Sequence, residues 1–184
     1  MKELSLNILD IAMNSVKAKA TVIEILIDET ADSLTLTIKD NGCGMKPDFL
    51  KTVANPFSTT RTTRKVGLGL PFLKLEAEMT GGRMEISSKH IDEYPDSHGT
   101  VVTAEFFKNH IDYTPLGDVV STVTTLIQGS PDIDFVYRHL CPNGKVELDT
   151  RELRAVLGDD ISLNNIEIIK WIADSLNAEY GELK

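Results

Sequence analysis

The stretch SLTLTIKDNGCGM, residues 33–45, joins a strand pattern to a glycine-rich loop. Its leucines and isoleucine alternate with polar residues, so they share one face of a strand, and Asp40 has the same parity. Because that apolar face must pack under helices, we predict that Asp40 points into the layer between sheet and helices. A carboxylate there needs a hydrogen-bond donor. A ligand amino group would serve, and so would the backbone N–H groups of the turn Asn41-Gly42.

Outward from this stretch, the chain alternates between helix and strand patterns. The predicted helices span residues 4–18, 48–54 and 68–79, and the predicted strands span residues 22–27, 33–39, 83–88 and 100–107. This order of elements predicts an α/β fold of the α+β two-layer sandwich type, in which one mixed sheet carries helices on one face.

The tail has a different pattern, and we place a boundary that gives domains at 1–108 and 109–184. A small α+β C-terminal extension is predicted, with helices at 116–128, 151–157 and 165–176 and a hairpin of strands 132–140 and 145–148. Its residues Cys141, His139 and Asp149 are scattered in the sequence and predict no catalytic constellation. Cys141 is interpreted as a packing residue, and Trp171 as part of the core of the tail.

Composition narrows the class of protein. Of 184 residues, 41% are hydrophobic, which is enough for a real core. The 28 acidic against 19 basic residues give a net charge of −9, which disfavours nucleic-acid binding, since a basic face is needed to displace phosphate counterions. The two distant cysteines predict neither a disulfide framework nor a metal-ligand pair. With no apolar span or secretory signal visible, we expect a cytoplasmic protein without nucleic-acid or membrane partners.

The first predicted helix carries an acid, an amide and a cation on one narrow face. Asp10, Asn14 and Lys17 fall within about 60° of one another at 100° per residue, opposite the apolar stripe. Such a face could hold a divalent cation through Asn14, contact phosphate through Lys17 and polarise a water through Asp10. The same pattern is also typical of an ordinary solvated helix face.

Two loops that contain glycines suit ligand binding. Gly42 and Gly44 would let the backbone approach a flat ligand without Cβ atoms in the way. Residues 58–65, STTRTTRK, bring together five hydroxyls and three cations, which cannot form a core but can bind an anion. Gly67 and Gly69 then open a helix whose free N–H groups and dipole favour negative charge. A polar surface loop would have the same composition.

Taken together, four motifs in order resemble those of the GHKL superfamily, the ATP-binding fold shared by gyrase, the heat-shock chaperone, histidine kinases and the mismatch-repair protein MutL. The motifs are LNILDIAMNSVKAKAT (6–21), IKDNGCGM (38–45), NPFSTTR (55–61) and KVGLGLPFLK (65–74), followed by Gly99-Thr100. The resemblance covers residues 4–107 and implies a Bergerat-type ATP-binding fold. The resemblance implies that the loop at residues 58–65 forms a lid over the nucleotide. This lid is short and runs into GLGL (67–70), which looks closest to histidine kinases and anti-sigma kinases.

The resemblance implies a role for each residue on the adenine side of the site. Asp40 would accept a hydrogen bond from the adenine amino group. Gly42 and Gly44 would shape the adenine slot, and Thr100 would support the adenine through a water.

On the phosphate side, the resemblance implies that Asn14 binds Mg²⁺ and that Lys17 reaches a phosphate of ATP. Asp10 stands where hydrolysing members place the glutamate that activates water, and because its side chain is shorter we expect slow hydrolysis. The residues implied to cover the phosphates are Arg61, Arg64, Lys65, Gly67, Leu68 and Gly69.

The function implied is that of an ATP-dependent protein kinase or regulatory switch acting on a separate protein partner or phosphoacceptor. Only three residues precede Leu4, and none of the four histidines is followed by Glu or Asp, so we expect no phosphoacceptor domain within the chain. The anti-sigma serine kinases are the nearest single-domain example. An ATP-responsive interaction module and a slow ATPase without kinase activity are the alternatives.

Overall fold

The computed structural model describes residues 3–54, 68–158 and 161–183. The strands are β1 (Val22–Glu29), β2 (Ser33–Asp40), β3 (Arg83–Lys89), β4 (Gly99–Phe107), β5 (Asp134–Cys141) and β6 (Gly144–Asp149). The helices are α1 (Leu4–Lys17), α2 (Pro47–Leu50), α3 (Gly69–Met79), α4 (Val119–Gly129), α5 (Thr150–Leu157) and α6 (Ile166–Glu182).

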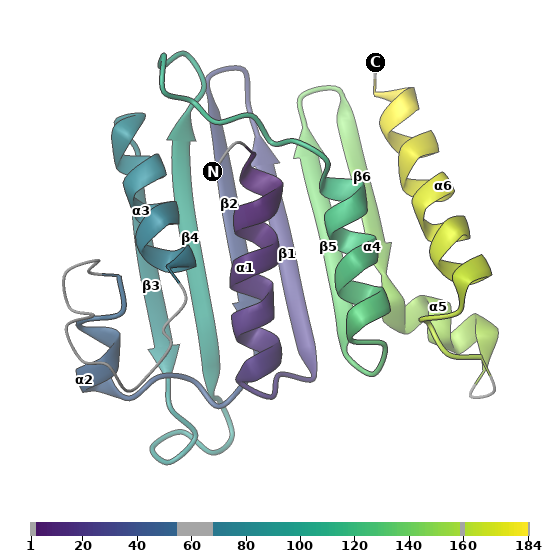
Figure 1. Ribbon diagram of the computed structural model, residues 1–184, viewed down its shortest axis with the longest axis horizontal. Helices are drawn as coiled ribbons and strands as arrows, with labels where there is room; N and C mark the ends of the chain where they lie inside the picture. Colours follow the sequence, from purple (N-terminus) through teal and green to yellow (C-terminus); the bar gives the residue numbers. More distant parts are fainter. Residues whose placement is uncertain (1–2, 55–67, 159–160, 184) are drawn as a thin grey trace.

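All six strands belong to one mixed sheet with the order β3-β4-β2-β1-β5-β6 (Figure 1). The pairs β1–β2, β2–β4, β3–β4 and β5–β6 are antiparallel. The pair β1–β5 is parallel, and α4 lies on the connection that brings the chain from β4 back to the side of β1. The predicted α+β two-layer sandwich with a mixed sheet is therefore confirmed.

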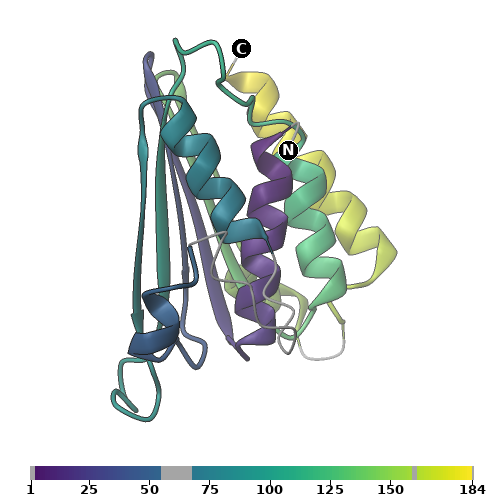
Figure 2. The same cartoon turned by 60° about the vertical axis from the view of Figure 1, so that its left-hand side comes forward.

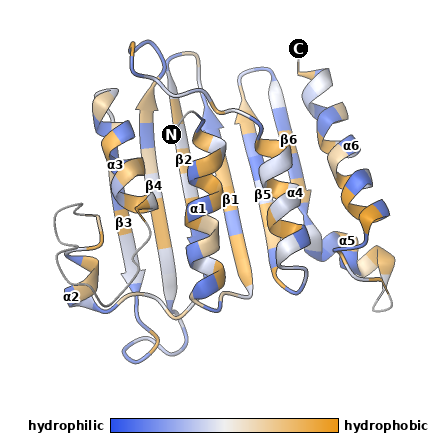
Figure 3. Cartoon of the chain, in the orientation of Figure 1, coloured by the Kyte–Doolittle hydropathy of each residue, from blue (hydrophilic) through white to orange (hydrophobic). Residues whose placement is uncertain are grey.

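Helices α1, α3, α4 and α6 lie on one face of the sheet (Figure 2). The core lies between these layers: Ile23, Ile25 and Ile27 of β1 are buried, as are the leucines of β2 that the alternation placed on the covered face. Helix α1 contributes its predicted apolar stripe, and hydrophobic and hydrophilic residues alternate around it in Figure 3. The alternation in the strands and the stripe on α1 thus determine which faces meet.

The other face of the sheet is polar. Lys39 and Glu24 are cross-strand neighbours with Nζ 2.9 Å from Oε1, and the hydroxyls of Thr37 and Thr103 lie 3.3 Å apart across β2 and β4. In β3 every second residue is exposed. One apolar and one solvated face is the usual arrangement for antiparallel strands.

The C-terminal extension continues the same sheet instead of forming a separate layer. The chain before α4 closes the start of α1, because Leu4 N–H donates to the carbonyl of Pro115 at 2.9 Å and Ser5 N–H to that of Leu116 at 2.8 Å. Residues 1–108 and the C-terminal extension are therefore joined by backbone hydrogen bonds. The division of the chain at residue 108 remains a prediction.

Three local expectations differ from the structure. Trp171 is 56% exposed, so its assignment to the core of the tail is wrong. The buried stripe of α6 passes through Ile172 and Leu176. Trp171 directly precedes Ile172, so its side chain points about 100° away from that stripe around the helix axis. Helix α2 is shorter than expected, whereas α6 continues to Glu182. Among the described helices, none has the length and apolarity required to cross a bilayer.

Candidate functional site

A cavity of about 720 Å³ opens between the C-terminal half of α1, the end of β2 and the segment around α2. This volume lies in the range of ligand sites. Its described lining residues are Ile11, Asn14, Ser15, Lys17, Ala18, Ile38, Asp40, Gly44, Met45, Lys46, Phe49, Val53, Leu70, His90, Thr100 and Val102. The lining is mainly apolar, with a few polar groups set among the hydrophobic side chains.

The Asp40 carboxylate is held firmly at the end of β2. It is 9% exposed. Its Oδ2 accepts a 2.6 Å hydrogen bond from the Ser15 hydroxyl on α1. Its Oδ1 accepts a 2.8 Å bond from the Gly42 N–H, so the turn considered from the sequence is formed. A carboxylate offers about four acceptor positions, so Asp40 retains acceptor capacity toward the cavity that it lines.

The two glycines of the motif IKDNGCGM (38–45) are required by the packing of the loop. Gly44 has φ +69°, and a Cβ there would lie 1.9 Å from the Lys89 carbonyl oxygen. A Cβ on Gly42 would lie 2.8 Å from the Cβ of Ala18, at the end of α1. Gly44 lines the cavity, whereas Gly42 is not among its described lining residues. Both glycines let the loop close against its neighbours, and this closure positions Asp40.

Hydrogen bonds that the sequence did not predict hold the wall opposite α1. Ser88 Oγ accepts a 2.8 Å bond from Met45 N–H and lies 2.9 Å from the Thr100 hydroxyl. His98 Nδ1 donates to the Gly42 carbonyl at 2.6 Å. Ser88, His98 and the Asp40 partner Ser15 were missed because each acts on a residue distant in the sequence. For Ser15, a hydroxyl on the buried side of α1 was the available signal.

The structure separates the three polar residues of α1. Asn14, which is half-buried, and Lys17, which is exposed, both line the cavity. Asp10 is exposed and is not among the described lining residues. It stands beside the start of α3, because a Cβ built on Gly69 would lie 3.4 Å from Asp10 Oδ2. An amide and a cation therefore face the cavity, and the acid faces the first turn of α3.

The motif KVGLGLPFLK (65–74) is described in the structure only from Leu68 onward. Leu68 is 52% exposed, Gly69 begins α3, and the next residue, Leu70, reaches the cavity. Among the residues that the structure describes, no side chain caps the first turn of α3, so its N–H groups suit an anion. The predicted phosphate-covering residues Arg61, Arg64, Lys65 and Gly67 lie outside the described residues.

Two sensor proteins each match about half of this chain. The chain is 31% identical over 97 residues to the tetrathionate sensor histidine kinase TtrS of Salmonella typhimurium, a match that covers 53% of this chain and 16% of that protein. It is 35% identical over 85 residues to the C4-dicarboxylate transport sensor protein DctB of Pseudomonas aeruginosa, and this match covers 45% of this chain and 14% of that protein. The matches thus span only about one sixth of the first relative and one seventh of the second.

Solved structures share the fold. The MutL ATPase domain of Aquifex aeolicus, determined with ADP, superposes with a TM-score of 0.56 at 14% identity, covering 85% of this chain and 69% of that one. The model of the family described as histidine kinase-, DNA gyrase B- and HSP90-like ATPase matches residues 1–125, more than half of the chain. This chain therefore belongs to the histidine kinase-, DNA gyrase B- and HSP90-like ATPase family.

Proposed function

We propose that the cavity binds Mg-ATP. The chain uses the nucleotide either to phosphorylate a separate protein partner or to regulate its binding to that partner. The observation that carries the proposal is the Asp40 carboxylate, fixed by Ser15 and Gly42 at the rim of an apolar cavity. An aromatic base with an exocyclic amino group matches this combination, because the ring buries apolar surface while the amine donates to the carboxylate.

The adenine half of the ligand would lie between strand residues and the α2 segment. Ile38 and Val102, neighbours across β2 and β4, supply an apolar floor, and Phe49 of α2 also lines the cavity. Thr100 is paired with Asp40 in the β2–β4 register, so its hydroxyl is at the same end of the sheet. This arrangement supports the roles that the resemblance implied for Asp40 and Thr100.

The phosphate half would extend toward α1 and the start of α3. Lys17 at the cavity and the free N–H groups of the first turn of α3 both attract negative charge. Asn14 offers an amide oxygen from the cavity wall. Mg²⁺ prefers oxygen ligands and commonly binds through few protein groups together with phosphates and water. The donor set therefore fits Mg²⁺ held by Asn14, where the ion would neutralise phosphate charge.

Asp10 would act at the reacting end of the nucleotide, because it stands beside the turn at which the phosphates would end. As a base it would orient a water, or the hydroxyl or imidazole of a partner. The similarity to sensor kinases favours transfer to a partner over free hydrolysis.

Calorimetry with ATP and Mg²⁺ tests the binding, and label transfer tests the outcome. The full chain is incubated with γ-labelled ATP, with and without cell extract. Label on a partner protein supports a kinase, and slow release of labelled phosphate identifies an ATPase. Bound but intact ATP identifies an interaction module. Failure to bind ATP at all would remove the proposed function.

A further inference from the structure

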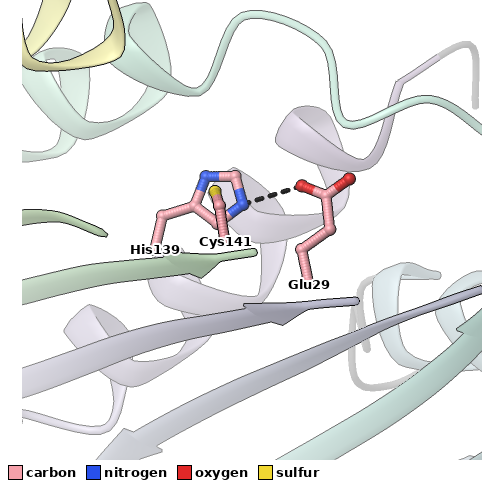
Figure 4. A group of neighbouring side chains, drawn as sticks. All are labelled: Glu29, His139 and Cys141. Atoms are coloured by element: carbon pink, nitrogen blue, oxygen red, sulfur yellow. Dashed lines mark hydrogen bonds and ion pairs between the residues drawn. The ribbon is translucent and has the colours of Figure 1, made fainter. Parts of the chain in front are cut away.

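A second polar cluster lies at the end of the sheet away from the cavity. His139 and Cys141 are two residues apart on β5 and share one face of the strand, whereas Glu29 is distant in the sequence. The parallel register pairs Ile27 with His139, and the strands end side by side. This places both tail residues next to Glu29, the last residue of β1. Figure 4 shows the three side chains turned toward one another. Their nitrogen, sulfur and oxygen ligand atoms all lie within 4.8 Å of one another.

The cluster has a closed and an open side. His139 is 3% exposed under the helical layer, whereas Glu29 and Cys141 are half-buried. The imidazole is therefore fixed by packing, and a small ion could enter from the side of the carboxylate and the thiol. His139 Nε2 lies 2.9 Å from Glu29 Oε2.

Neighbouring groups already orient the three side chains. The Tyr180 hydroxyl of α6 lies 2.8 Å from His139 Nδ1, the ring nitrogen that points away from Glu29. Lys108 Nζ donates to Glu29 Oε1 at 2.6 Å, which leaves Oε2 toward His139. Partners on the second nitrogen and the second oxygen are the usual outer contacts of histidine and carboxylate metal ligands.

We propose that Glu29, His139 and Cys141 form a binding site for a zinc-type divalent transition-metal ion, with three protein ligands and a fourth position open to solvent. Nitrogen, carboxylate oxygen and thiolate sulfur are the ligands of zinc, and three protein ligands with one open position is a known arrangement. The thiolate favours such an ion over Mg²⁺ or Ca²⁺, which take oxygen ligands.

The distances are compatible with a tetrahedral ion. Zinc bonds of about 2.0–2.3 Å place two ligand atoms roughly 3.3–3.6 Å apart. The 2.9 Å between His139 Nε2 and Glu29 Oε2 must therefore open slightly, and Cys141 Sγ must close in from within 4.8 Å. Adjustments of this size need side-chain rotation and no change in the strand pairing.

Binding redistributes two protons. The imidazole proton moves from His139 Nε2 to Nδ1, where the Tyr180 oxygen accepts its hydrogen bond, and Nε2 bonds to the metal. The Cys141 S–H bond breaks, a sulfur–metal bond forms, and that proton goes to solvent. Burial lowers the pKa of His139 despite the neighbouring Glu29. Burial and then Glu29 raise the pKa of the Cys141 thiol, so the metal must displace its proton.

The bound ion would join β1, which lies within residues 1–108, to β5 of the C-terminal extension. Tyr180 would extend this link to α6. Metal binding would therefore stabilise the attachment of the extension to the sheet, without involving the cavity at the other end.

Cobalt titration of the chelator-treated full chain tests the proposal. Co²⁺ should produce a thiolate-to-metal charge-transfer band that saturates at one ion per chain, and Zn²⁺ should abolish it. At a Zn²⁺ concentration 100 times Kd, the Tm should rise by about 5 to 10 °C. Cys141→Ser should remove the band, and Glu29→Gln should weaken Zn²⁺ binding at least about tenfold.

Cys43→Ser is the matched control, because Cys43 is the other half-buried free thiol and lies in the glycine loop. It should leave the band and the affinity unchanged. Circular dichroism of the metal-free variants checks that each is folded. A missing band, a band that survives Cys141→Ser, or one lost in Cys43→Ser would overturn the proposal and leave the cluster as a hydrogen-bonded joint.

Discussion

Replacing Asp40 by Asn tests the proposed adenine contact with minimal change of shape. The Gly42 N–H donates a 2.8 Å hydrogen bond to Asp40 Oδ1. In the variant, the amide oxygen must therefore occupy the position of Oδ1 in order to accept this bond. The amide nitrogen then takes the place of Oδ2, where the Ser15 hydroxyl can rotate to accept its bond. The variant should therefore fold normally but present a donor where the adenine amine also donates.

The expected loss of ATP affinity in Asp40→Asn follows from the burial of the Asp40 carboxylate. Asp40 is 9% exposed, so water cannot easily rescue the mismatched pair. An unsatisfied buried polar group costs about 1–3 kcal/mol. Since 1.4 kcal/mol corresponds to a factor of about ten, the affinity for ATP should fall roughly 10- to 100-fold. Ser15→Ala removes only the orienting bond and leaves the carboxylate, so its loss should be about 1 kcal/mol, or roughly fivefold.

Calorimetry at fixed Mg²⁺ measures these affinities. Asp174→Asn on the exposed side of α6 is the matched control and should bind ATP as the unmodified chain does. Tripolyphosphate, which lacks the base, should bind equally to Asp40→Asn and to the unmodified chain. Unchanged ATP affinity in Asp40→Asn would refute the reasoning, because the proposed acceptor would then not contact the base.

Three further predictions concern turnover, folding and pH. Asp10→Asn should abolish phosphate release or transfer while sparing ATP binding. Asp10→Glu should raise basal hydrolysis if the short Asp10 side chain limits the contact with the attacking water. Rapid turnover by the unmodified chain would contradict this role of Asp10. Gly44→Ala should lower the free energy of unfolding, measured in urea, by about 2 kcal/mol or more. Gly44 has a φ of +69°, and the added Cβ would clash with the Lys89 carbonyl oxygen. Gly129→Ala should not lower the free energy of unfolding, because the added Cβ would lie in open space. The Ser121 side chain and then its backbone N–H lower the pKa of Asp118, the N-cap of α4, below its usual 3.8. The cap should therefore stabilise the fold above that pH and be lost as pH falls through the lowered pKa. In urea unfolding, Asp118→Asn should reduce this acid sensitivity; an unchanged pH profile would exclude the cap as its cause.

The sequence alone was sufficient for features that depend on local periodicity. Alternation along residues 33–40 predicts both the strand and the inward direction of Asp40, and the structure places that carboxylate against α1. The helical phase of α1 likewise separates its buried stripe from the polar face that carries Asn14 and Lys17. These patterns are legible because each depends on residues within one element, whose geometry the backbone sets.

Only the tertiary structure decided which distant elements become neighbours. The sequence did not show that β5 pairs with β1, and therefore did not show that Glu29, His139 and Cys141 meet. It also did not indicate that Ser15 holds Asp40, nor that Trp171 faces outward from α6. Pairing across the chain depends on the summed packing of every layer, which no local pattern encodes. The directions of side chains are therefore predictable from the sequence, whereas their partners emerge when the sheet is assembled.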